Sequence, residues 1–393
     1  HLRSSLAWGS LAILAIASLL LVRLGSEPGH FTAAEIAARH LSSSLGAIFN
    51  DPLNAPFSLP QHFLVAISPH SLFLSRLPAA FYGGLTLLIL YAILRFWQGR
   101  LVATLETVLL ATSSWFLHIT ETGTSEVLLF GIVPLVGCAL LLKHTLRRSL
   151  AFALGLVVVA SLLYVPGMIW LIWLGVIWRA QSIVRNLKHI DRRLIVAGII
   201  IFLIVIAPLI RACYYQPSLI LDVFGLPAKL PSAITVIHNA ANIPLQLFIR
   251  TPTSNPFTWV GRLPALDIFT DVMFVLGLYL IWKHRELDRS KLVGGSILGA
   301  AALIILGDPV GFTSLLPLVY LVVAGGIGYM SDRWLRVFPN NPLARTAGIS
   351  LLTVAVIVSA NFQLKRYFVA LPYALRLPPT IQQEPQVSAT IKS

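Results

Sequence analysis

The chain is built from long apolar runs separated by short polar segments. A helix rises 1.5 Å per residue, so roughly 20 apolar residues cross a hydrocarbon core about 30 Å thick. The pattern therefore predicts an all-α polytopic membrane protein with about eleven transmembrane helices. The predicted spans are residues 6–23, 77–94, 101–117, 126–142, 150–164, 167–178, 194–211, 268–282, 292–306, 312–330 and 346–361.

Residues 150–178 form one long apolar stretch that is interrupted by Pro166 and Gly167. The flanks, 143–148 and 179–193, are both strongly basic, and short basic loops remain on the cytoplasmic side of a membrane. The chain must therefore leave the cytoplasm and return between them. This predicts two short helices in place of one kinked helix.

Successive spans alternate in direction, so the other short basic loops also lie inside. Two long segments, at about 25–76 and 212–267, then lie outside. Their Pro, Asn, Ser and aromatic content indicates a packed extracytoplasmic cap. The first contains a short amphipathic stretch, 32–46. We expect a transmembrane domain over 1–361 that includes both loops, and an extracytoplasmic tail over 362–393.

Composition agrees with a membrane protein, because 57% of the 393 residues are hydrophobic and only 11% are charged, against about 25% charged in soluble domains. The net charge of +14 comes from clusters between apolar runs, so it predicts topology and no nucleic-acid partner. The first run is longer than a signal-peptide core, so we interpret it as a retained helix. Cys138 and Cys213 supply no disulfide framework, and no metal site or cofactor is predicted.

Acidic residues near membrane level are costly, so those on the predicted outer side are candidates for chemistry. They are Glu27, Glu35, Asp51, Glu121, Glu126, Asp222, Asp267, Asp271 and Asp308. Thr32 and Glu35 have capping-box spacing, which favours a structural role for Glu35. Glu126 begins a predicted helix, where the helix dipole alone favours a carboxylate.

Most arginines fit a topological or interfacial role. Arg76 precedes the predicted second helix, where its guanidinium fork suits a phosphate. Arg211, Arg250 and Arg262 offer the same chemistry from the second long loop.

Three stretches over about residues 30–145 resemble the polytopic GT-C glycosyltransferases of the protein O-mannosyltransferase and aminoarabinose-transferase type. They are "FTAAEIAARH" with "NAPFSLPQHFLVAI", "SRLPAAFYGGLTLLILYAILRFWQG" and "ATSSWFLHITETGTSEVLLFGI". The resemblance implies a membrane glycosyltransferase that inverts configuration. It also implies a donor sugar on a polyprenyl phosphate, an extracytoplasmic lipid, glycan or protein acceptor, and a bacterial plasma membrane with the active site outside.

The resemblance implies that Glu35 is the base and that Glu126 is a second acid. The family usually shows an Asp-Glu pair, whereas this chain has Ala34 and Glu35, and Glu121 stands where many members carry Arg. Three readings stay open: Glu35 acts alone, Asp51 substitutes for the missing acid, or the chain is a non-catalytic relative that binds lipid or a partner. A lipid-linked glycan transporter or flippase is a further alternative.

Overall fold

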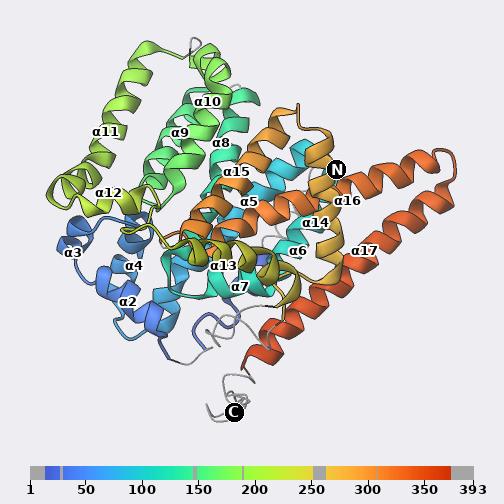
Figure 1. Cartoon of the computed structure of the whole chain (residues 1–393), viewed down its shortest axis with the longest axis horizontal. Helices are drawn as coiled ribbons and strands as arrows, with labels where there is room; N and C mark the ends of the chain where they lie inside the picture. The colour runs from blue at the N-terminus through green and yellow to red at the C-terminus, as the bar shows by residue number, and fades with distance from the viewer. Residues whose placement is uncertain are drawn as a thin grey trace, which may run out of the picture.

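The computed structural model describes residues 14–26, 30–144, 148–187, 190–250, 263–307 and 309–372. Within these ranges the protein is all-helical (Figure 1). Before the second long loop the helices are α2 Ala33–Leu41, α3 Leu45–Asn50, α4 Ala55–Ile67, α5 Leu72–Gln98, α6 Arg100–Thr112, α7 Ser114–Glu121, η1 Ser125–Gly131, α8 Ile132–His144, α9 Arg148–Leu162, α10 Met168–Leu187 and α11 Arg192–Tyr215. They continue with α12 Ser218–Val223, α13 Ala233–Pro244, η2 Leu245–Ile249, α14 Ile268–Lys283, α15 Asp288–Leu306, η3 Phe312–Leu315, α16 Leu316–Val337, α17 Pro342–Lys365 and η4 Arg366–Ala370.

The protein is an integral, multi-pass membrane protein. Among the described residues, six helical segments are long and apolar enough to cross a membrane, or seven if the bent pair α6 and α7 counts as one span. Shorter apolar helices lie at Ser149–Leu162, Met168–Ile177 and Ala233–Ile249. The all-α polytopic class is therefore confirmed, whereas the count of eleven spans stays a prediction.

The long apolar stretch around Pro166 forms two helices, α9 and α10, as the basic flanks predict. Gly167 turns the chain with a φ of 74°, a conformation that costs glycine little. The backbone N–H of Gly167 donates to Val223 O at 3.1 Å, which ties this turn to the second long loop.

Several predicted helix boundaries are wrong. The second helix begins at Leu72 and not at 77, because Ser71 caps it by accepting a hydrogen bond from the Leu74 N–H, so Arg76 lies inside α5. The run predicted as 101–117 breaks at Ser113, whose extended ψ of 127° ends α6, and α7 follows at an angle of 61°. The last helix also continues to Lys365, beyond the predicted 361.

The outer turns and loops predicted to form a cap meet one another. In Figure 1, α2, α3 and α4 lie beside α12 at one end of the bundle. Asn54, in a left-handed conformation before α4, donates its N–H to Tyr164 O at 2.8 Å. A Cβ on Gly225 would come within 2.8 Å of Gly167 Cα, so glycine lets the two turns touch.

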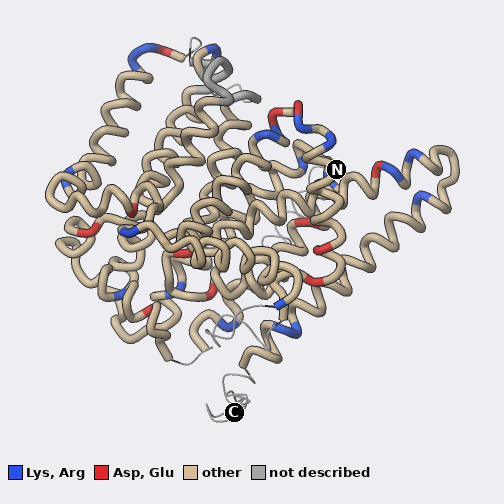
Figure 2. The backbone as a smooth tube through the Cα atoms, viewed as in Figure 1, with Lys and Arg blue, Asp and Glu red and all other residues tan. Residues whose placement is uncertain are grey.

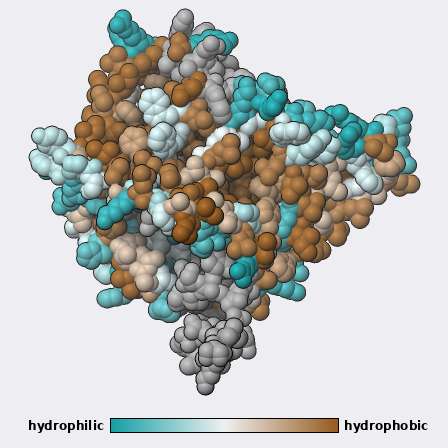
Figure 3. Space-filling view, in the orientation of Figure 1, coloured by the Kyte–Doolittle hydropathy of each residue, from teal (hydrophilic) through white to brown (hydrophobic). Residues whose placement is uncertain are grey.

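Basic residues mark a different edge of the molecule. Figure 2 shows Lys and Arg along the turns that join α10 to α11, α14 to α15 and α16 to α17. These three turns, all predicted as cytoplasmic, therefore lie apart from the cap. Figure 3 shows apolar surface over α11 and α17 between these regions. Ile200, Leu203 and Ile204 of α11 are exposed, as expected of side chains that face lipid.

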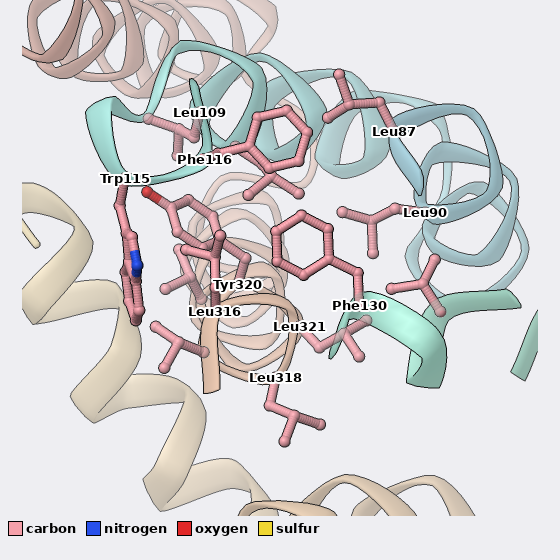
Figure 4. Packing of buried hydrophobic residues seen from close by; sticks show 14 of the residues in the cluster. Leu87, Leu90, Leu109, Trp115, Phe116, Phe130, Leu316, Leu318, Tyr320 and Leu321 are labelled. Atoms are coloured by element: carbon pink, nitrogen blue, oxygen red, sulfur yellow. The ribbon is translucent and has the colours of Figure 1, made fainter. Parts of the chain in front are cut away.

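The core of the bundle is an aromatic and leucine cluster between α5, α7, η1 and α16 (Figure 4). Phe116 and Phe130 stack with ring centroids 5.7 Å apart, and Tyr320 is 1% exposed. Each aromatic ring buries a large apolar area in the cluster. The cluster therefore stabilises the packing of α5, α7 and η1 against α16.

Helices α14 and α16 pack at backbone contact through glycines. A Cβ on Gly277 would lie 2.0 Å from Val322 O, and a Cβ on Gly326 would lie 2.0 Å from Met273 O. Small residues allow this close approach in membrane helices, where van der Waals packing drives association.

We therefore expect Gly277→Ala to separate α14 from α16 and to lower the free energy of unfolding by about 1–3 kcal/mol, the usual cost of overpacking. The check is denaturation in detergent. Gly299→Ala is the matched control, because a Cβ on Gly299 meets nothing within 4 Å. Equal stability of the two variants would contradict the proposed packing role of Gly277.

Candidate functional site

A buried ion pair joins the first long loop to the bundle. Glu35 in α2 is 0% exposed and Arg76 in α5 is 1% exposed. Arg76 Nε donates to Glu35 Oε1 at 2.6 Å, and Arg76 Nη2 donates to Oε2 at 3.1 Å. This bidentate geometry is the strong form of a carboxylate–guanidinium pair.

Backbone groups use the same carboxylate. Thr32 N–H donates to Glu35 Oε2 at 2.8 Å, while Glu35 N–H donates to Thr32 Oγ1 at 3.3 Å, so the predicted capping box is confirmed. The Gly123 N–H, from the turn between α7 and η1, donates to Oε1 at 2.9 Å. Each oxygen of Glu35 therefore accepts two hydrogen bonds.

Gln61 of α4 completes this buried polar cluster. Its Nε2 donates to Ser75 O and Gly123 O, each at 3.1 Å, and its Oε1 accepts from Ser42 Oγ at 3.0 Å. We call Glu35, Arg76, Gln61 and Gly123 the cap clamp. It fixes α2, α4 and the α7–η1 turn to the start of α5.

The clamp also lowers the pKa of Glu35. Burial by itself raises the pKa of Glu35, but hydrogen bonds from Arg76, Thr32 and Gly123 outweigh it and leave the pKa below its ordinary value of 4.5. The carboxylate is thus charged at neutral pH. Its hydrogen bonds and complete burial describe a structural anchor, and a role as base stays a prediction.

Glu126 and Glu121 lie near one another in sequence but in different surroundings. Glu126, exposed at the start of η1, accepts a hydrogen bond from Thr313 Oγ1 at 2.9 Å. Glu121, the last residue of α7, is 3% exposed and accepts from Tyr367 Oη at 3.0 Å. No hydrogen bond or ion pair joins the described atoms of Glu126 to those of Glu35, so the two predicted acids do not form a contacting pair.

Asp51, the third predicted acid, is less enclosed than Glu35. It caps α3, is half-buried, and accepts from the Leu53 N–H through Oδ1 at 3.4 Å. Within the described part of the chain, Asp51 Oδ2 has no hydrogen-bond partner. An oxygen of Asp51 therefore remains available to accept a proton.

The four predicted phosphate-binding arginines differ in their surroundings. Arg76 belongs to the clamp. Arg211 and Arg250 are exposed, and the guanidinium of Arg211 lies 5.8 Å from the ring centre of Tyr215. Arg262 lies outside the described residues.

An apolar pocket of about 390 Å³ lies between the cap and α11. Its walls include Phe49, Pro56, Tyr82, Tyr164, Val205 and Pro208. The Tyr82 hydroxyl donates to Pro56 O at 2.7 Å, which leaves the aromatic ring facing an apolar space. We call this space the cap pocket. It is flanked in sequence by Asp51 and by Arg211.

Sequence patterns do not reveal Gln61, Tyr82 or Tyr164 as parts of these sites. Gln61 looks like one polar residue in an apolar helix, which is a weak signal of a buried partner. The tyrosines lie 82 positions apart, so only the tertiary fold brings them together. Among the described residues, no three His, Cys, Asp or Glu side chains gather into a metal-binding group.

Comparison with solved structures explains the architecture. Two crystal structures of ArnT from Cupriavidus metallidurans, one bound to undecaprenyl phosphate and one in the apo state, match with TM-scores of 0.57 and 0.54. Each is 13% identical, and the matches cover 93% and 94% of this chain and 77% and 76% of ArnT. The chain has a GT-C-like fold. Neither a protein-family model nor a curated protein sequence matches it.

We expect Glu35→Gln to lower the free energy of unfolding by about 3–5 kcal/mol, because it leaves a buried guanidinium without its counter-ion. Chemical denaturation at neutral pH measures this change. Glu286→Gln is the control, because its pair with Arg285 spans 3.8 Å and both side chains are more than 70% exposed, so it contributes about 1 kcal/mol or less.

The pH dependence follows from the lowered pKa of Glu35. Its stabilisation is present above the ordinary value of 4.5 and is lost as the pH falls through the lower folded-state pKa. Denaturation curves for Glu35→Gln should therefore lose part of the acid-induced destabilisation seen in the wild type. Parallel pH profiles for the two proteins would contradict the ion-pair account.

Proposed function

We propose that this protein is a membrane glycosyltransferase that moves a sugar from a polyprenyl phosphate to an extracytoplasmic acceptor with inversion. The observation that supports it is the cap pocket, an apolar space whose lining residues lie close in sequence to a carboxylate, Asp51, and to an arginine, Arg211. The GT-C-like fold adds support, since ArnT was solved with undecaprenyl phosphate bound.

The cap pocket has the chemistry that an isoprenoid chain requires. Its described lining is almost wholly apolar or aromatic and comes from α3, α4, α5, α9 and α11. A volume of about 390 Å³ falls in the ~300–1,000 Å³ range of small-molecule sites. It holds the phosphate-proximal isoprene units, and the rest of the chain lies along the lipid-exposed face of α11.

Arg211 is the proposed phosphate ligand. It lies three residues beyond Pro208, a pocket residue, and therefore on nearly the same face of α11, one turn farther out. Its guanidinium is exposed and rests against Tyr215. A fixed cation at this place stabilises the charge that develops on the departing lipid phosphate.

Asp51 is the proposed base, in preference to Glu35. Phe49 and Pro52, on either side of Asp51, line the pocket. The carboxylate takes the proton of the acceptor hydroxyl while that oxygen attacks the anomeric carbon from the face opposite the phosphate. The bond between this carbon and the phosphate oxygen breaks, and polyprenyl phosphate leaves with the electron pair. Glu35 has each oxygen engaged by donors of the clamp and is fully buried.

A non-catalytic relative that binds the lipid phosphate is the second candidate, favoured by the use of Glu35 in the clamp. It predicts binding of undecaprenyl phosphate without sugar transfer from any lipid-phosphate donor. Both outcomes are measured in the same preparation of purified protein in nanodiscs.

We expect Asp51→Asn to reduce kcat by about 10²- to 10⁴-fold, the usual contribution of a positioned base, with unchanged lipid binding. Transfer from polyprenyl-phosphate sugars in nanodiscs measures it, with Glu286→Gln as the control. Full activity of Asp51→Asn would remove Asp51 from the mechanism. Activity lost only in Glu35→Gln, per folded molecule, would restore Glu35 as base.

Arg211→Gln should weaken undecaprenyl phosphate binding by about tenfold or more, as expected for loss of one charge-assisted contact. Arg193→Gln is a matched control, because Arg193 is exposed on the opposite end of the same helix. Titration with the lipid in nanodiscs provides the measurement. Equal affinities of the two variants would exclude Arg211 as the phosphate ligand.

A further inference from the structure

A second pocket, of about 490 Å³, lies at the basic edge of the bundle between α14, α15, α16 and the end of α5. Four cationic side chains line it: Lys283, Arg289, Arg333 and Arg336. One carboxylate, Asp332, also lines it. The pocket is thus strongly cationic and is separate from the cap and its pocket.

The positive-inside rule accounts for basic residues in these turns but not for their convergence on one pocket. Arg285 lies in the turn between α14 and α15, and Arg345 lies at the start of α17, just after the turn that follows α16. Neither of them lines the pocket. Arg285 pairs with Glu286, and Arg345 donates to Pro339 O at 3.4 Å. Arg333 Nε also makes a local contact, because it donates to Tyr329 Oη at 3.4 Å, but Tyr329 itself lines the pocket, so this contact keeps the Arg333 guanidinium at the pocket.

The inner wall of the pocket is apolar. Leu280, Val293 and Leu321 contribute to it, together with the indole of Trp97. Gly328 has no side chain and so admits the Gln98 amide, because a Cβ there would lie 1.9 Å from Gln98 Oε1. Cations at the rim, an amide and an apolar wall together match an amphiphile whose headgroup is anionic.

We propose that this pocket binds the phosphate headgroup of an anionic phospholipid from the inner leaflet. The guanidinium groups of Arg289 and Arg333 hold the phosphate, and the acyl chains lie against the apolar wall. Basic pockets between transmembrane helices are suited to such headgroups, because basic residues near the membrane surface attract anionic lipids. This inference stands independently of the proposed glycosyl transfer.

The test measures lipid retained by the purified protein, using native mass spectrometry with phosphatidylglycerol and phosphatidylcholine. The variant is Arg289→Gln/Arg333→Gln, and the control with the same charge change is Arg285→Gln/Arg345→Gln. We expect the pocket variant to lose phosphatidylglycerol about 10- to 30-fold and the control to retain it. Glycerol 3-phosphate at matched concentration should not compete, since it lacks acyl chains.

Asp332→Asn protects this test from failures of folding. Removing the lining carboxylate should increase phosphatidylglycerol retention several-fold, and a misfolded variant does not gain affinity. Equal losses in the two double variants would mean a diffuse surface attraction and overturn the proposal. Competition by glycerol 3-phosphate would identify a soluble anion in place of a lipid, and retention of phosphatidylcholine equal to that of phosphatidylglycerol would also contradict it.

Discussion

The buried pair of Glu35 and Arg76 is the constraint on which the arrangement of the cap depends. Removing two charges from water is costly unless they are paired and their remaining hydrogen-bonding groups are satisfied. The protein meets this requirement with the Thr32 and Gly123 N–H groups on the carboxylate and with carbonyl oxygens, including that of Leu24, on the guanidinium. Three segments that are distant in sequence must therefore meet at one point. The cap is a packed structure for that reason.

Fixing the cap has a consequence for the chemistry. A carboxylate held by four donors is a good anchor and a poor acceptor of a further proton. The cap pocket is lined by other residues of α4, and its lining lies close in sequence to Asp51, which keeps an oxygen available, and to Arg211 of α11. We therefore propose one acid of the first loop, Glu35, as the anchor of the cap and another, Asp51, as the base. This division also fits the sequence, in which Ala34 stands where the resemblance leads one to expect an acid.

Much of the fold follows from the sequence because lipid imposes simple rules. Apolar length predicts the all-α polytopic class, and the basic flanks of 150–178 predict two helices there; both are observed. The Thr32–Glu35 capping box is also local, so it is predictable. The partner of Glu35 is not, since Arg76 lies 41 positions away and inside a helix that begins earlier than hydropathy indicates. The cap pocket joins five helices and has no sequence pattern of its own. The hydropathy of 101–117 is continuous, so the sequence does not predict the break at Ser113. The helix ends there because of the backbone torsion angles of Ser113.

We propose that the clamp holds the cap while the lipid phosphate binds at the cap pocket. The most direct measurement is an electron cryomicroscopy structure in nanodiscs with undecaprenyl phosphate bound. The account predicts isoprenoid density between α4, α9 and α11, phosphate density within hydrogen-bond distance of the Arg211 guanidinium, and an intact Glu35–Arg76 pair. Phosphate density on Arg76, with Glu35 released toward the ligand, would contradict it.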